Sequence, residues 1–207
     1  HWTQQNAEPA CSERPEEWQE EHQEEPQAVT ICGIGPHRKT LSGDVLFTTL
    51  LEAAEQRLWI ATPYFVPDDR VISTLKSAAL RGVDVRVIVP KKSDHRIFPR
   101  VHQEFARELA PYGIKLFAFE PGFMHQKVML IDHKYGCVGS ANFDNRSLRL
   151  NFETLAVVYG AAFCAQIETM LISDFSQSAQ ITPDALPEQG VWSRLLSRST
   201  RLLSPVL

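Results

Sequence analysis

The sequence predicts an α/β fold, a layered α/β/α sandwich around a mixed, mostly parallel sheet. Three observations lead to this prediction. Strand-like and helix-like segments alternate from residue 28 onward, with short loops between them. The expected strands are rich in apolar and β-branched residues, as strands buried on both faces are. Several later strands follow one another without a helix between them, so the sheet is expected to be mixed.

The elements follow from hydrophobic periodicity and from turn residues. The expected strands are residues 28–34, 57–62, 83–89, 114–119, 125–132, 135–140 and 152–159. The expected helices are residues 44–56, 68–80, 99–110, 161–176 and 191–203. Pro63 stops the second strand, and Asp68 or Asp69 caps the second helix. Gly82 and Gly113 follow the ends of the second and third helices.

The first 27 residues are expected to be an acidic, disordered linker. Residues 1–26 hold eight glutamates and one arginine, a charge of −7. Since the whole chain carries −4, residues 27–207 carry +3. A segment with so few aliphatic residues cannot bury enough surface to offset its ordering entropy. A single exposed helix is the alternative, because Glu and Gln are good helix formers.

The composition is that of a soluble globular protein, and no run of about 18 apolar residues could span a bilayer. The four cysteines form no CxxC pair and no zinc-site spacing. We therefore expect them to serve as small buried hydrophobic residues of a protein in a reducing compartment. The chain starts at His1, with neither an initiator methionine nor a signal peptide. We therefore expect it to be part of a longer polypeptide.

A compound motif in the second half of the chain carries the chemistry. His125, Lys127 and Asp132 fit HxKxxxxD, and Gly139, Ser140 and Asn142 fit GSxN. Together they resemble the signature of the phospholipase D superfamily. Residues 64–68, 81–84, 93–95, 121–123 and 202–205 resemble the C-terminal half of bacterial cardiolipin synthases. The resemblance implies that residues 28–190 form a phospholipase D-like catalytic domain bearing the second of two such motifs.

Spacing assigns roles to the motif residues. His125 and Lys127 share one face of a strand, whereas Asp132 has the opposite parity. Asp132 is included among the candidate catalytic residues because it belongs to the motif. We expect its carboxylate to hold the end of the strand or a neighbouring basic side chain. Lys127, Ser140 and Asn142 can bind the non-bridging oxygens of a phosphodiester.

Residues around these side chains are expected to complete the anion site. Gly139 would let the backbone approach a ligand closely. A helix starting near Asp144 would aim free N–H groups at an anion.

His125 is the candidate for proton or phosphorus chemistry, because imidazole can act as nucleophile or acid near neutral pH. Glu153 is the expected acceptor of an Nδ1–H bond, either from His125 or from the histidine of a partner half. No cluster of metal ligands accompanies the motif, so we expect catalysis without a metal or cofactor.

Three further features have two interpretations each. Arg146 could bind substrate or form a structural ion pair with Asp144 or Asp132. The loop around His95, with Lys91 and other cations, could contact an anionic lipid headgroup or be a solvated surface loop. Residues 191–207 are expected to form a basic amphipathic helix, which suits a membrane interface or a site on the domain core.

The resemblance implies a phosphatidyltransferase that converts two phosphatidylglycerol molecules into cardiolipin and glycerol through a phosphohistidine. The second motif would come from the same polypeptide or from a second copy. The enzyme would act at the bacterial cell membrane, peripherally or on its cytoplasmic side, with a membrane surface as partner.

Two other function classes remain open. One is a homodimeric phosphodiesterase or nuclease, although a charge of only +3 on residues 27–207 gives little footing for nucleic acid, and none is expected as a partner. The other is a non-catalytic half that binds anionic lipid.

Overall fold

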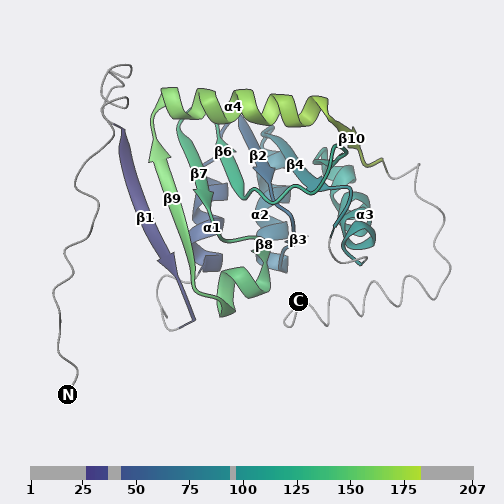
Figure 1. Cartoon of the computed structure of the whole chain (residues 1–207), viewed down its shortest axis with the longest axis horizontal. Helices are drawn as coiled ribbons and strands as arrows, with labels where there is room; N and C mark the ends of the chain where they lie inside the picture. The colour runs from purple at the N-terminus through teal and green to yellow at the C-terminus, as the bar shows by residue number, and fades with distance from the viewer. Residues whose placement is uncertain (1–26, 37–42, 94–96, 183–207) are drawn as a thin grey trace.

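The computed structural model describes residues 27–36, 43–93 and 97–182. One eight-stranded sheet forms the middle layer, with α4 across one face and α1, α2 and α3 over the other (Figure 1). The α/β/α sandwich predicted from the sequence is confirmed. Within the described ranges, no helix is long and apolar enough to cross a membrane.

The strands of the large sheet lie in the order β1-β9-β7-β6-β2-β4-β5-β10, and β3 pairs with β8 in a separate two-stranded sheet. The bounds of the large-sheet strands are β1 Ala28–Ile34, β2 Arg57–Ala61, β4 Asp84–Pro90, β5 Lys115–Phe119, β6 Val128–Ile131, β7 Tyr135–Gly139, β9 Glu153–Tyr159 and β10 Ser178–Gln180. The short pair is β3 Phe65–Val66 and β8 Phe143–Asp144.

The sheet is mixed, as predicted, but the expected predominance of parallel pairing is wrong. Among the described strands of the large sheet, only β2–β4 and β4–β5 pair in parallel. The other five neighbour pairs of the large sheet are antiparallel. The parallel pairs are joined through α2 and α3, whereas β6 and β7 are joined by a turn too short for a parallel crossover.

The α-helices are α1 Gly43–Glu52, α2 Asp69–Leu80, α3 Phe98–Leu109 and α4 Ala161–Ser176. A 3₁₀ turn, η2 Ala110–Tyr112, follows α3, and a π-type turn, η3 Arg146–Leu150, precedes β9. The predicted cap of α2 is confirmed, because the Asp68 side chain accepts the N–H of Val71 at 2.9 Å. Gly82 and Gly113 take left-handed φ values of 92° and 83°, which end the α2 and η2 segments as glycine readily does.

Two predicted elements differ from the structure by more than one residue at an end. The first helix ends at Glu52, four residues before its expected end at residue 56. The strand expected at residues 125–132 begins only at Val128, so His125 and Lys127 lie in the segment that leads into β6. The linker at residues 1–26, His95 and the helix at 191–207 lie outside the described residues.

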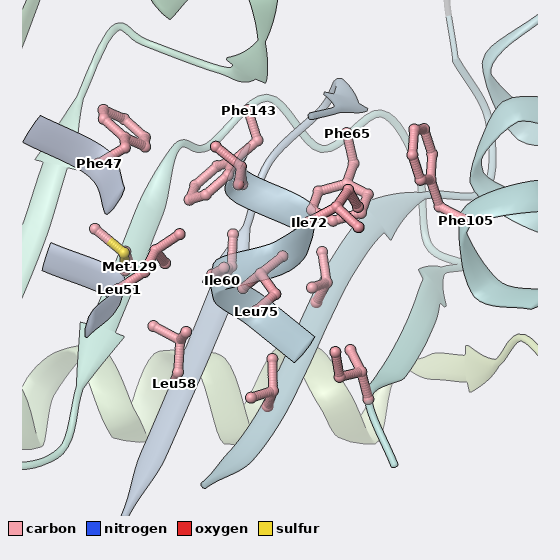
Figure 2. Close-up of a cluster of buried hydrophobic side chains, with 14 of the residues drawn as sticks. Phe47, Leu51, Leu58, Ile60, Phe65, Ile72, Leu75, Phe105, Met129 and Phe143 are labelled. Carbon is pink, nitrogen blue, oxygen red and sulfur yellow. The ribbon is translucent and has the colours of Figure 1, made fainter. Parts of the chain in front are cut away.

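Hydrophobic side chains fill both layers. The larger cluster joins the sheet to α1, α2 and α3, and the smaller one joins it to α4. In the larger cluster, Phe65 and Phe143 lie between α1 and α3 (Figure 2), with Phe143 packing edge-on against Phe47 at 5.0 Å between ring centroids. Full burial of one such side chain contributes roughly 1.5–3 kcal/mol. Phe143 therefore anchors the residues on either side of it, Asn142 and Asp144.

Candidate active site

The motif residues gather at one end of the sheet, which we call the motif end. Strand β7 runs antiparallel to both β6 and β9. The end of β7 at Gly139 therefore lies beside the starts of β6 and β9. The N–H of Gly139 donates to the carbonyl of Lys127 at 3.3 Å, and the N–H of Ser140 donates to the carbonyl of Thr154 at 2.9 Å. Three segments distant in sequence thus converge.

His125 and Lys127 lie together at the motif end, as predicted. The Lys127 Nζ atom is 3.2 Å from Nδ1 and 3.3 Å from Nε2 of His125, and it donates to the His125 carbonyl at 2.8 Å. Phe123 stacks on the exposed imidazole, with 5.5 Å between ring centroids and 29° between planes. An exposed imidazole and the ammonium of a half-buried lysine therefore lie side by side, an arrangement suited to a phosphodiester.

Burial lowers the pKa of Lys127 below its usual range, and the nearby carboxylates of Glu153 and Asp144 oppose part of this shift. A lysine with a lowered pKa loses its charge at a lower pH than an ordinary surface lysine does. Anion binding at the motif end should therefore weaken on the alkaline side.

Glu153 starts β9 and takes its hydrogen bonds from its own half. The hydroxyl of Ser140 donates to one carboxylate oxygen, and the Asn151 amide donates to the other at 3.1 Å. Among the described residues, no hydrogen bond joins Glu153 to His125, so the first of the two expected pairings is not present. The alternative pairing, with the histidine of a partner half, stays a prediction.

Gly139 is required for a reason that the sequence did not reveal. A Cβ atom at this position would lie 2.3 Å from the Thr154 carbonyl oxygen and 3.0 Å from Leu155 Cα. The close approach is therefore to the backbone of β9, whereas the expected close approach was to a ligand.

The segment after Ser140 carries Asn142 and Asp144. The Oδ1 atom of Asn142 is buried and has no hydrogen-bond partner among the described residues. The Asp144 carboxylate accepts the N–H of Ser147 at 2.7 Å. A helical turn does start near Asp144, at Arg146, but η3 is only five residues long. Asp144 takes the N–H of Ser147, so that group is not free for an anion.

Asp132 lies at the opposite end of β6, which we call the far end. It accepts the N–H groups of Gln56 and Arg57 at 2.8 and 2.9 Å and that of Glu55 at 3.1 Å. Burial alone would raise the pKa of Asp132, but these backbone bonds lower it below the usual value. The structure therefore separates Asp132 from His125 and Lys127 and assigns it to holding the start of β2.

The remaining predicted residues are peripheral. Arg146 is exposed and, in the part of the chain that is described, forms no ion pair with Asp144 or Asp132. Lys91 pairs with Glu120 at 2.6 Å. His95 lies outside the described residues.

Sequence reasoning missed Phe123 as a neighbour of His125, and it missed Arg149. Arg149 ties η3 to the α2 cap Asp68 and, at 3.3 Å, to Asp44 on α1. Both residues lie in polar or loop-like stretches, where hydrophobic periodicity gives no signal.

The cysteines behave largely as expected. Cys137 and Cys164 are buried, Cys32 is partly buried, and all three are free. Burial raises the pKa of Cys137 to about 12, so its thiol is unreactive near neutral pH. Cys11 lies outside the described residues. No group of three potential metal ligands occurs within residues 27–36, 43–93 and 97–182.

Comparison with known proteins identifies the family. The family described as cardiolipin synthase, PLD-like domain, matches residues 47–175. The chain is 44% identical to cardiolipin synthase A of Pseudomonas entomophila over 185 residues, covering 88% of this chain and 39% of that protein. It is 41% identical to cardiolipin synthase A of Pseudomonas aeruginosa over 177 residues, covering 86% and 36%. The chain thus spans little more than a third of the length of these relatives.

Solved structures show the same fold. Phosphatidylserine synthase of Haemophilus influenzae matches with a TM-score of 0.69 and 18% identity, over 87% of this chain and 48% of that one. Nuc of Salmonella typhimurium, a phospholipase D family member, matches with a TM-score of 0.63 and 19% identity, over 76% and 99%. Together with the family match over residues 47–175, the motif-end geometry leads to one assignment: the chain belongs to the phospholipase D-like domain family of the cardiolipin synthases.

Proposed function

We propose that this chain supplies one of the two catalytic motifs of a phosphatidyltransferase that makes cardiolipin from two phosphatidylglycerol molecules. The observation that carries the proposal is the convergence of His125, Lys127 and the Ser140–Asn142 segment at the motif end. A second motif-bearing half, in the same polypeptide or in a second copy, would face His125 and complete the site.

The reaction has two displacements at phosphorus. In the first, a histidine nitrogen attacks the phosphorus of one phosphatidylglycerol, the P–O bond to its headgroup breaks, and glycerol leaves with a proton from the second histidine. In the second, that histidine removes a proton from a headgroup hydroxyl of another phosphatidylglycerol. The resulting oxygen nucleophile attacks phosphorus and the P–N bond breaks. Two easier steps replace one difficult step.

His125 is assigned the acid–base role, with the nucleophile on the other half, following the resemblance to the C-terminal half of the family. The Lys127 ammonium and an N–H of the Asn142 amide would stabilise the charge that grows on the non-bridging oxygens, where fixed donors are most effective. The Ser140 hydroxyl and the Asn151 amide both donate to the Glu153 carboxylate and hold it in place. In this position it would orient the histidine of the facing half.

Lipid substrates place the enzyme at a membrane surface, and we propose peripheral contact of this domain with the bacterial membrane. The exposed side chains near the motif end include Phe123 at 53% exposure, Leu150 at 54% at the end of η3, and Phe152 at 73% just before β9. Apolar side chains of this kind could contact either acyl chains or the facing half.

The test is the His125→Ala variant of the complete enzyme, assayed with phosphatidylglycerol vesicles for cardiolipin and released glycerol. We expect turnover to be lost while the thermal unfolding midpoint is unchanged, because His125 is exposed. His133→Ala is the matched control, since His133 is an exposed histidine at the far end and should keep wild-type turnover. Normal cardiolipin output from His125→Ala would refute the proposal.

A homodimeric phosphodiesterase is the second candidate, because a domain of this fold makes up 99% of the Nuc chain. It predicts that the chain alone is a dimer in solution and hydrolyses a soluble diester. A monomer without this activity would leave the phosphatidyltransferase as the sole catalytic proposal.

A further inference from the structure

Side chains alternate between the two faces of the sheet along β6 and in the segment that leads into it. One row belongs to the cluster that joins the sheet to α4, and it comprises Met124, Val128 and Leu130. The other row belongs to the cluster with α1, α2 and α3, and it comprises Met129 and Ile131. Because this alternation has a period of two, His125 and Lys127 are in line with Met129, and Gln126 is in line with Met124.

Gln126 is thus a polar residue in the row that faces α4, between the two reactive residues. Its side-chain Nε2 donates to the Oδ2 atom of Asp174 at 2.5 Å. Asp174 lies in the last turn of α4. The chain between His125 and Lys127 is therefore tied to α4 on the side opposite to the reactive pair.

The backbone alone holds this segment weakly. Within the described part of the chain, residues 123–126 form no backbone–backbone hydrogen bond. The pairing with β7 begins one residue later, where the N–H of Gly139 donates to the carbonyl of Lys127 at 3.3 Å. The Gln126 side chain therefore supplies a polar anchor at the point where the strand ladder has not yet begun.

The place of Asp174 in α4 is not explained by the helix itself. A carboxylate in the last turn of a helix is unfavourable, because the C-terminal end of the helix dipole is negative. Among the described residues, the Asp174 carboxylate has a single hydrogen-bond partner, which is Gln126. The hydrogen bond that it accepts from Gln126 is therefore the best reason for a carboxylate at this position.

We propose that Gln126 and Asp174 are positioning residues: their hydrogen bond sets where His125 and Lys127 stand at the motif end. The proposal rests on the proposed function, because the two residues that are positioned are those assigned to proton transfer and to the phosphate. Displacement at phosphorus needs the reacting groups in line, and a misplacement of about 1 Å can slow a reaction by about 100-fold.

Exchanging the two groups tests the proposal in the complete enzyme, assayed with phosphatidylglycerol vesicles. Gln126→Glu sets two carboxylates against each other, so we expect kcat to fall by about 10- to 100-fold, with a smaller change in KM. Asp174→Asn keeps an oxygen that accepts from Gln126, and it should retain most of the wild-type kcat. The double variant Gln126→Glu/Asp174→Asn again has one donor and one acceptor, in reversed order, so it should recover most of the loss.

Gln126→Met is the second variant, because methionine has a similar length but neither a donor nor a charge. We expect its kcat to fall by at least about 10-fold. Glu168→Met is the matched control, since Glu168 also lies on α4 and accepts from Arg57 of β2 at 2.7 Å, but at the far end. This control should lower the thermal midpoint at least as much as Gln126→Met does and leave kcat unchanged.

A purely structural contact predicts that kcat, measured well below the thermal midpoint, is unchanged in Gln126→Met or falls equally in Glu168→Met. Either result would overturn the positioning role, and so would a double variant as slow as Gln126→Glu. Failure of both Gln126 variants to fold would also overturn it, by assigning the contact to stability. The His125→Ala reference separates the two proposals. If the wild type makes cardiolipin and His125→Ala does not, unaltered Gln126 variants reject only the positioning role.

Discussion

The hydroxyl of Ser140 donates to the carboxylate of Glu153 and accepts the N–H of the neighbouring Thr154 at 3.0 Å. One side chain thereby joins the segment after β7 to the start of β9. The relationship fixes the carboxylate at the motif end before any substrate or second half is present, and pre-organised groups need no rearrangement during reaction.

Ser140→Ala should release Glu153 from this segment. We expect a loss of stability of about 1 kcal/mol from the missing hydrogen bonds. Turnover should fall more than this, because Glu153 is no longer fixed. Chemical denaturation and cardiolipin synthesis measure the two effects. Ser176→Ala, which removes an exposed hydroxyl bonded only within α4, should change neither.

Lys127→Met should remove the ammonium from the phosphate site and lower kcat/KM by about 100-fold or more. Because burial lowers the pKa of Lys127, wild-type activity should decline at a lower pH than for an ordinary lysine. Lys127→Arg should shift that decline to higher pH, since a guanidinium stays protonated. Lys134→Met, at the exposed far end, should behave as wild type. An identical alkaline limb in Lys127→Arg would exclude Lys127 as its source.

Asp132→Ala should destabilise the domain without acting on the chemistry directly. Three backbone N–H groups lose their acceptor, so we expect a cost of about 2–3 kcal/mol. These bonds lower the pKa of Asp132 despite its burial, so the stability is present above the unfolded pKa and is lost as the pH falls through the folded value. Urea unfolding at several pH values measures this. Asp69→Asn, an exposed residue of α2, should cost at most about 1 kcal/mol.

Gly139→Ala should destabilise the β7–β9 pair by about 1–3 kcal/mol, because the new Cβ would meet the Thr154 carbonyl oxygen. Gly33→Ala, in β1, is the matched control, since a Cβ there meets nothing within 4 Å. Thermal unfolding of the two variants compares them. Equal midpoints would contradict the steric explanation.

Much of the fold could be predicted because its elements are long and periodic. Helix α4 and strand β1 have their predicted bounds, and α2 begins at its predicted cap. Strands β3 and β8 are only two residues each and give no periodic signal. The prediction of a mostly parallel sheet was wrong, although the three-residue turn between β6 and β7 already requires an antiparallel pair.

The site was predicted in part for a related reason. His125 and Lys127 are two residues apart, so their proximity follows from local geometry. The burial of Asp144 could not be predicted, since it lies in a polar run and is covered by β3, which is distant in sequence. Likewise, the closeness of Gly139 to Thr154 depends on sheet pairing that no local pattern specifies.

Strand β6 is attached to the rest of the molecule differently at its two ends. Asp132 takes a left-handed φ of 54° and clamps the start of β2, while Lys127, before the other end, remains available to a ligand. The four residues between them, Val128–Ile131, are all buried and extend roughly 13 Å at the usual rise per residue. The four-residue spacer of HxKxxxxD therefore sets the distance between the anchored Asp132 and the pair His125 and Lys127. An insertion or deletion in the spacer would shift this pair relative to the anchor.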